Sequence, residues 1–293
     1  MEVKQDETYL QAIDCVPPPY HGMLASLPEG HDIEEVRLRA GRPPTVKRLG
    51  GERETGLPPV SAELLRDILS RAARYSVHSY ADSLRHGFLT LAGGHRLGVC
   101  GTAVMENGEV SGIRGISSLN LRVARQIEEA GSEIAPLENG KPCSMLLLAP
   151  PGLGKTTLLR ELARRVSDSG LSVAVADERC EIAALSSGRP QFEVGACTDV
   201  IEGCGKKEAA MMLLKTMSPA LLVVDEITAP EDVEAVALCA HCGVSVLASA
   251  HARDLEDLRK RALYRTLLKL GLFERAVVIS LEDGRRKYQI ETL

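Results

Sequence analysis

The sequence predicts an α/β protein of two domains, in which a C-terminal domain built on a parallel sheet follows a smaller N-terminal α+β domain. Three observations support this prediction. The chain has 293 residues, which is long enough for two hydrophobic cores. From Cys143 onward, apolar strand candidates alternate with helix candidates, as in a parallel sheet that helices cover on both faces. Before Cys143, glycine turns separate short strand candidates, which is typical of hairpins.

The N-terminal domain is expected over residues 1–128, and a polar linker over 129–142. Ser61 is a suitable N-cap for an amphipathic helix, Gly93-Gly94 is a hairpin turn, and a further turn begins at Asn107. The expected elements, in chain order, are a short helix or coil over 1–30, a strand over 33–38, a helix over 61–75, and strands over 87–91, 95–104 and 119–124.

The C-terminal domain is expected over residues 143–293. Its strand candidates are 144–149, 172–176, 220–225 and 244–250, and its helix candidates are 155–168, 206–217, 230–241 and 254–270. The longest apolar region, 233–250, contains Glu234, His241 and Gly243, so it is expected to be a helix and a strand and not a membrane span. Parallel sheets bind ligands outside the carboxyl ends of their strands, which directs attention to the residues that follow each strand.

The first strand end is a glycine-rich loop between an apolar strand and a helix. Its sequence, A-P-P-G-L-G-K-T-T over 149–157, matches a phosphate-binding loop, in which backbone N–H groups and the helix N-terminus surround phosphate oxygens. A chance Gly/Pro loop is disfavoured by the flanking strand and helix. Lys155 adds a positive charge, and the Thr156 hydroxyl is expected to bind Mg²⁺. The predicted nucleotide-binding residues are Pro151, Gly152, Leu153, Gly154, Lys155, Thr156 and Thr157.

One residue departs from the G-x-x-x-x-G-K-[ST] pattern. Ala149 stands where the pattern has its first glycine. Because a positive φ is unfavourable for alanine, this end of the loop is expected to avoid that conformation.

Acidic residues and a histidine follow the other three predicted strands. Asp177 and Glu178 follow one strand, and Asp225 and Glu226 follow another. Near a bound triphosphate, Asp225 is expected to hold Mg²⁺ and Glu226 to orient the attacking water. His251 follows the fourth strand, where it is either a donor to the γ-phosphate or a structural residue.

Composition narrows the possible partners and location. The net charge is −5, only 3% of residues are aromatic and there is no Trp, so we expect no nucleic acid partner. The eight cysteines are scattered and no signal peptide is evident, which favours reduced thiols in the cytoplasm. The single C-x-x-C pair, Cys239 and Cys242, favours a buried helix over a metal site.

These motifs resemble those of the hexameric ATPases of type II and type IV secretion systems. Three segments, EVRLRAGRP over 35–43, DERCEI over 177–182 and MSPALLVVDEI over 217–227, are more closely similar to the stage III sporulation protein AA family. The resemblance implies a RecA-like P-loop NTPase fold with ATP and Mg²⁺ as cofactors. It also implies a cytoplasmic ATPase, peripheral at the membrane in the mother cell of a spore-forming bacterium. The implied partners are the other stage III A membrane proteins and further copies of the chain, as in a hexamer.

The resemblance also suggests two further kinds of site residue. Secretion ATPases have an acidic strand end that matches Glu178 as a possible catalytic base, so Glu178 is an alternative to Glu226. They carry Gly-Glu where this chain has Asp225-Glu226. Their N-terminal domain lends arginines to a nucleotide site, which makes Arg122 and Arg125 candidates to complete the active site within a subunit or from a neighbour. The alternative is that both arginines lie on a solvated strand face.

The leading functional hypothesis is a ring-forming ATPase that drives a membrane-associated transport complex. A slowly hydrolysing, ATP-dependent switch or assembly scaffold is the alternative. A nucleic-acid translocase is disfavoured by the acidic net charge and the few aromatic residues.

Overall fold

The computed structural model describes residues 6–28, 30–48, 51–74, 87–106, 108–125, 130–186, 188–282 and 285–293. The chain folds into two compact units. The first unit comprises Met1–Arg125 and Leu185–Gln191, and the second comprises Gln126–Ala184 and Phe192–Leu293. Each unit has a hydrophobic core of its own.

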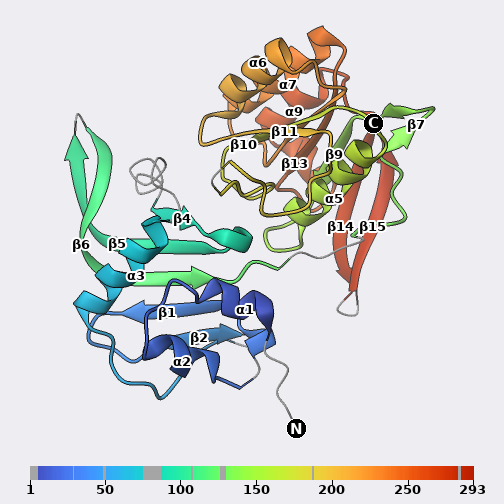
Figure 1. The fold of residues 1–293 in the computed structure, drawn as a ribbon. Helices are drawn as coiled ribbons and strands as arrows, with labels where there is room; N and C mark the ends of the chain where they lie inside the picture. Colours follow the sequence, from blue (N-terminus) through green and yellow to red (C-terminus); the bar gives the residue numbers. More distant parts are fainter. Residues whose placement is uncertain are drawn as a thin grey trace. The chain divides into compact units, whose positions relative to one another are not determined.

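The first unit is built on a six-stranded antiparallel sheet (Figure 1). The predicted hairpin around Gly93-Gly94 is confirmed, while the strand predicted over 119–124 is the end of one 14-residue strand. The turn predicted at Asn107 lies outside the described residues. In sheet order the strands are β3 (Gly51–Glu54), β2 (Thr45–Arg48), β1 (Glu35–Arg39), β6 (Glu109–Arg122), β5 (Arg96–Glu106) and β4 (Phe88–Thr90).

Helices cover this sheet. The hydroxyl of Ser61 accepts a hydrogen bond from the backbone N–H of Leu64 at 3.1 Å, which confirms the predicted N-cap. Leu65, Ile68 and Ala72 recur at helical spacing and are buried against the sheet. The described helices of this unit are α1 (Glu7–Ala12), α2 (Tyr20–Ala25) and α3 (Ala62–Arg74), with short 3₁₀ helices at Gly30–Asp32 and Ala92–Gly94.

The second unit is built on a seven-stranded, mostly parallel sheet. Neighbouring strands run parallel from β11 to β14, and β15 returns antiparallel to β14. In sheet order the strands are β11 (Thr198–Glu202), β10 (Val173–Asp177), β12 (Leu221–Val224), β13 (Ser245–Ala250), β9 (Met145–Leu148), β14 (Arg275–Glu282) and β15 (Arg285–Thr292). A separate hairpin consists of β7 (Leu137–Glu138) and β8 (Lys141–Pro142). The predicted fold class is confirmed.

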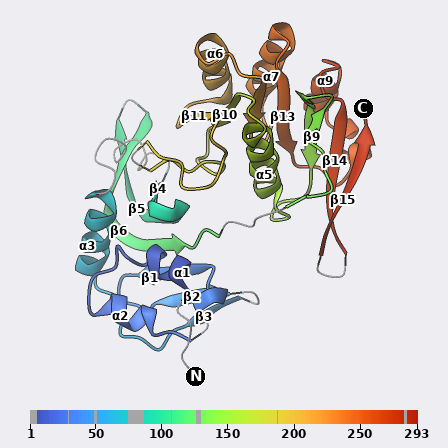
Figure 2. The ribbon, with the colours of Figure 1, turned by 45° about the vertical axis from the view of Figure 1, so that its right-hand side comes forward.

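Helices lie on both faces of the parallel sheet (Figure 2). Side chains alternate between the faces along each strand, so that Leu147 packs on the α5 side and Leu146 on the other. α5 (Lys155–Asp168) covers one face. The opposite face is covered by α6 (Lys206–Thr216), α7 (Pro230–Cys242), α8 (Leu255–Lys260) and α9 (Ala262–Leu268).

The predicted helix over 254–270 is wrong in one respect, because it is two helices that meet at Arg261. Arg261 has φ −95° and ψ 131°, which is extended backbone. The Arg265 guanidinium donates to the carbonyls of Arg259 (3.0 Å) and Lys260 (2.8 Å), which satisfies acceptors at the end of α8. The sequence analysis also missed β11, β14 and β15, and β15 is exposed along most of its length.

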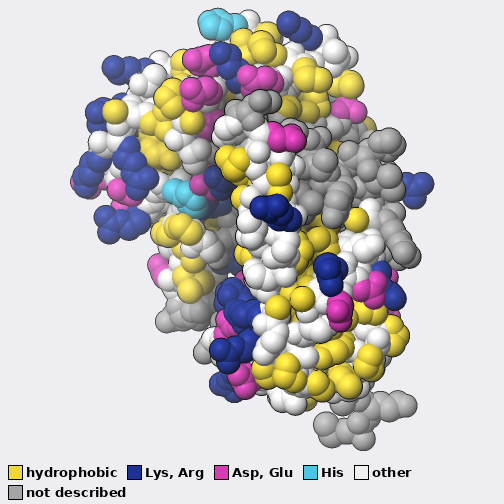
Figure 3. All heavy atoms as spheres, turned by 90° about the vertical axis from the view of Figure 1, so that its left-hand side faces the viewer, with side chains coloured by type: hydrophobic (Ala, Val, Ile, Leu, Met, Phe, Trp, Pro, Cys, Tyr) yellow, Lys and Arg dark blue, Asp and Glu magenta, His cyan; other side chains and the backbone are white. Residues whose placement is uncertain are grey.

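The apolar region 233–250 forms most of α7 and then β13, as predicted. In the described part of the chain, none of the helices combines the length and the hydropathy that a membrane span requires. All eight cysteines lie in that part, and none forms a disulfide. Basic, acidic and hydrophobic side chains are interspersed on the face drawn in Figure 3.

Candidate active site

The phosphate loop joins β9 to α5. Gly152 and Gly154 have φ of 81° and 90°, which glycine adopts at little cost. Ala149 is not among the described residues with positive φ, in agreement with its replacement of a glycine. Thr156 and Thr157 lie in the first turn of α5, which begins at Lys155. The loop therefore has the backbone conformation and the helix N-terminus that an anion site needs.

Lys155 turns back across this loop. Its Nζ lies 3.1 Å from the carbonyl oxygen of Ala149, 3.3 Å from that of Pro150 and 2.8 Å from Nδ1 of His251. An ammonium group only donates, so Nδ1 of His251 accepts and the ring proton is on Nε2. Burial lowers the pKa of Lys155, and the nearby carboxylates of Glu226 and Asp225 oppose this shift.

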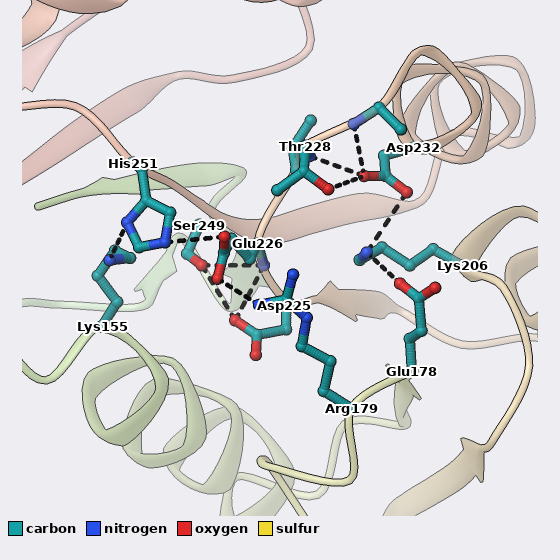
Figure 4. Close-up of polar contacts among 12 residues, drawn as sticks. Lys155, Glu178, Arg179, Lys206, Asp225, Glu226, Thr228, Asp232, Ser249 and His251 are labelled. Atoms are coloured by element: carbon teal, nitrogen blue, oxygen red, sulfur yellow. Dashed lines mark hydrogen bonds and ion pairs between the residues drawn. The ribbon is translucent and has the colours of Figure 1, made fainter. Parts of the chain in front are cut away.

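Glu226 continues the chain of contacts (Figure 4). Its Oε1 lies 2.8 Å from Nε2 of His251, and its Oε2 accepts a hydrogen bond of 2.8 Å from the Arg179 guanidinium. Only 15% of the Glu226 side chain is exposed. The residue has φ 22°, an uncommon conformation for a non-glycine residue that often marks functional sites. The structure thus brings together Lys155, His251 and Glu226, which the sequence analysis predicted from three separate strand ends.

Asp225 lies beneath this chain of contacts and is buried. Its Oδ1 accepts hydrogen bonds from the Glu226 backbone N–H (2.9 Å) and from the Ser249 hydroxyl (3.1 Å). Burial, together with the carboxylates of Glu181 and Asp177, raises the pKa of Asp225 to about 6. A cation beside this carboxylate favours its charged form.

Glu178 belongs to a second cluster, which Figure 4 shows apart from the first. Its carboxylate forms an ion pair with Lys206, which begins α6 and is only 3% exposed. Lys206 also lies 3.4 Å from Asp232 of α7. Asp232 in turn accepts hydrogen bonds from the backbone N–H groups of Thr228 (2.7 Å) and Ala229 (3.0 Å), in the loop after Glu226.

Asp177 has yet another role. It is fully buried and accepts hydrogen bonds from the backbone N–H groups of Glu181, Ile182 and Ala183 at 2.8, 3.0 and 2.9 Å. The buried guanidinium of Arg160 in α5 donates to the carbonyls of Glu181 and Ile182. Asp177 therefore fixes the loop after β10, and its neighbours Glu178 and Arg179 reach the two different clusters.

Both candidate arginines of the N-terminal unit have partners within the same unit. Arg122 is 60% exposed, and its Nε lies 3.7 Å from Oε1 of Glu35. Arg125 donates to the Asp6 carboxylate at 2.8 Å and to the carbonyl of Ile33 at 2.8 Å. Arg125 is thus bound within its own unit, whereas most of Arg122 is exposed.

Sequence reasoning missed Lys206 and Arg286. Lys206 follows the Gly203–Gly205 turn, and a lysine at a helix start gives no sign of burial. Arg286 lies on β15, and its Nε donates to the carbonyl of Leu153 in the phosphate loop at 3.0 Å. The unpredicted β14–β15 hairpin carries it there.

The chain is similar to known proteins both in sequence and in fold. The family described as sporulation stage III, protein AA matches residues 23–290. The chain is 38% identical over 286 residues to stage III sporulation protein AA of Bacillus subtilis (strain 168), covering 92% of this chain and 91% of that protein.

Two solved structures share the fold at low identity. The ATPase DotB of Legionella pneumophila has a TM-score of 0.59 and 16% identity, covering 89% of this chain and 76% of that one. The pilus retraction motor PilT, solved with bound ADP, has a TM-score of 0.60 and 16% identity, covering 89% and 79%. The chain therefore shares its fold with these two proteins. Because the family match and the bacterial relative both extend over most of the sequence, the chain belongs to the sporulation stage III protein AA family.

Proposed function

We propose that the chain is an Mg²⁺-dependent ATP hydrolase. The observation that carries this proposal is the contact chain from Lys155 through His251 to Glu226, directly beside the phosphate loop. Phosphoryl transfer to water depends on positioning of the phosphates, positive charge on the transferred group and a residue that orients the water. The loop, Lys155 and Glu226 can supply these three functions.

The residues present also fit Mg²⁺. The ion prefers hard oxygen ligands, and the Thr156 hydroxyl after β9 and the Asp225 carboxylate after β12 offer them at two carboxyl ends of the same parallel sheet, with β13 between the two strands. Within the described residues, Oδ1 of Asp225 takes both hydrogen bonds, which leaves Oδ2 for the ion or for its water. When bound, Mg²⁺ would neutralise charge on the phosphates.

In this proposal Glu226 is the group that orients and deprotonates the attacking water. Glu226 is nearly buried and shares a contact chain with Lys155, whereas Glu178 is 42% exposed and paired with Lys206. His251 bridges Lys155 and Glu226, and this contact supports a role for His251 as a donor to the γ-phosphate once a nucleotide separates those two residues.

We further propose that the ATPase forms a homo-oligomeric ring, such as a hexamer, and acts at the membrane with the other stage III A proteins of spore formation. The name of the Bacillus relative supports the sporulation role, and the likeness to PilT, a pilus retraction motor, supports motor activity. The expected location is the cytoplasmic side of the membrane in the mother cell.

The test is phosphate release from Mg²⁺·ATP by the full chain, with and without EDTA and with and without DNA or RNA, together with molar mass in solution with and without nucleotide. Hydrolysis that requires the metal and accompanies an ATP-linked shift to a closed ring is expected. Slow hydrolysis by a species whose mass does not change would instead favour the switch or scaffold. Stimulation by DNA or RNA would favour the translocase.

A further inference from the structure

The second arginine of β15 lies against the phosphate loop. Besides the hydrogen bond from Nε to the Leu153 carbonyl, the guanidinium packs on Gly154. A Cβ atom at Gly154 would lie 3.0 Å from Nε of Arg286 and 3.2 Å from its Cζ and Nη2. The glycine therefore provides both the positive φ of the loop and the space for this side chain.

The strand order shows from which side Arg286 approaches. β13 and then β12 lie on one side of β9, and they are followed by His251 and Glu226. β14 and β15 lie on the other side of β9. Arg286 thus reaches the loop from the side opposite to the residues assigned to the γ-phosphate.

The hairpin holds Arg286 at a defined position. β14 pairs with β9, and Leu281 of β14 is the register partner of Arg286. Two residues further along β15, Tyr288 packs against the core beneath α5. Among the described residues, the hydrogen bond that Arg286 donates uses Nε, so both Nη groups can donate to a ligand.

We propose that Arg286 is a nucleotide-binding residue that contacts the α- and β-phosphates, the part shared by ATP and ADP. This inference rests on the proposed function. The backbone of a phosphate loop surrounds the α- and β-phosphates, and its lysine reaches the β- and γ-phosphates. Arg286 contacts that backbone at Leu153 and Gly154, whereas Lys155 extends toward His251 and Glu226. A guanidinium is well suited to phosphate oxygens because its N–H groups form a planar fork.

The experiment measures the affinity of the full chain for ATP and for ADP with Mg²⁺ by calorimetry, and kcat at saturating ATP. Arg286→Ala is compared with Arg285→Ala, its exposed neighbour on the same strand, and with Arg286→Lys. We expect Arg286→Ala to weaken ATP and ADP by the same factor, roughly tenfold or more, because one charged hydrogen-bonding group is lost. Arg285→Ala should match the wild type in affinity and in kcat, and Arg286→Lys should recover part of the affinity.

Three outcomes would overturn the inference. If Arg286→Ala binds both nucleotides with wild-type affinity, Arg286 does not contact the phosphates. If Arg285→Ala loses as much affinity as Arg286→Ala, the loss reflects a general effect of positive charge. A fall in kcat with unchanged ADP affinity would mean that Arg286 only holds the loop through Leu153. If the wild type itself binds neither nucleotide, the proposed function fails first, so the two failures are distinguishable.

Discussion

Glu178 and Glu226 follow neighbouring parallel strands, β10 and β12, yet their surroundings differ. Glu226 is 15% exposed and bridges His251 and Arg179 beside the phosphate loop. Glu178 is 42% exposed and forms an ion pair with Lys206, which is tied through Asp232 to the start of α7. Strand order brings both glutamates to one edge of the sheet, but the cations around them separate their roles. This difference supports the proposal that the neighbours of a strand-end carboxylate decide whether it can act as the catalytic base.

The largest expected effect is that of Lys155→Ala. The substitution removes the ammonium that faces the loop and leaves His251 without its donor, so ATP binding should weaken sharply and hydrolysis should fall below detection. Phosphate release and nucleotide affinity check this. As a control, Lys207→Ala removes an exposed lysine of α6 and should leave both quantities unchanged. Near-normal hydrolysis by Lys155→Ala would refute the assignment of the phosphate loop.

Asp225→Asn is expected to reduce hydrolysis strongly while stabilising the nucleotide-free fold. The pKa of Asp225 is about 6 in the folded chain, against an ordinary value of 3.8. Keeping this carboxylate charged therefore costs on the order of 3 kcal/mol of folding free energy above pH 6. The cost vanishes below about pH 4, where the carboxyl is neutral in both states, and it grows as the pH rises from about 4 to 6. Urea unfolding at pH 4 and pH 7 should show equal stability at the lower pH and a more stable variant at the higher; equal stability at both would contradict the burial argument.

A similar comparison can be made between Arg122 and Arg125 of the N-terminal unit, by replacing each with alanine. If Arg122 supplies charge to the transferred phosphoryl, its loss should cut turnover by about a hundredfold or more and leave ATP affinity largely intact. Arg125→Ala should instead destabilise its unit by roughly 1–3 kcal/mol, because the Asp6 carboxylate and two backbone carbonyls lose their donor. Turnover, affinity and thermal unfolding measured on both variants separate these effects. Wild-type turnover in both would remove these arginines from the chemistry.

Glu178→Gln is expected to have the smallest effect. Its ion pair is partly exposed, so the free energy of unfolding should fall by no more than about 1 kcal/mol. Lys206 keeps Asp232 as a partner, and turnover should stay close to that of the wild type. Chemical unfolding and steady-state hydrolysis test this, and a large loss of turnover without loss of stability would reverse the roles of the two glutamates.

The predictions from sequence succeeded where the signal is local. The helix predicted over 155–168 has those bounds in the structure, because the glycine loop fixes its start and Ser169-Gly170 its end. β15 escaped prediction because it is an exposed edge strand without an apolar face. At the break, Arg261 is extended and the Arg265 guanidinium donates to carbonyls at the end of α8, and neither feature can be inferred from periodicity.

In the candidate site, too, the residues with a local sequence signal were predicted and those that depend on distant contacts were missed. Lys155, Asp225, Glu226 and His251 were predicted because each follows a parallel strand, and the sheet brings these strand ends together. The partner of Glu178 was not predicted, because Lys206 is 28 residues away along the chain and becomes a neighbour only in the folded sheet. Arg286 was missed for the same reason.

The most direct test of the assignment of Glu226 is the nucleotide that remains bound to each glutamine variant. Glu226→Gln and Glu178→Gln are incubated with Mg²⁺ and radiolabelled ATP, passed through a desalting column and analysed for bound ATP and ADP. We predict that Glu226→Gln retains unhydrolysed ATP, because binding groups remain while the base is lost, and that Glu178→Gln yields ADP at close to the wild-type rate. Retained ATP in Glu178→Gln together with normal hydrolysis by Glu226→Gln would contradict the account and assign the base to Glu178.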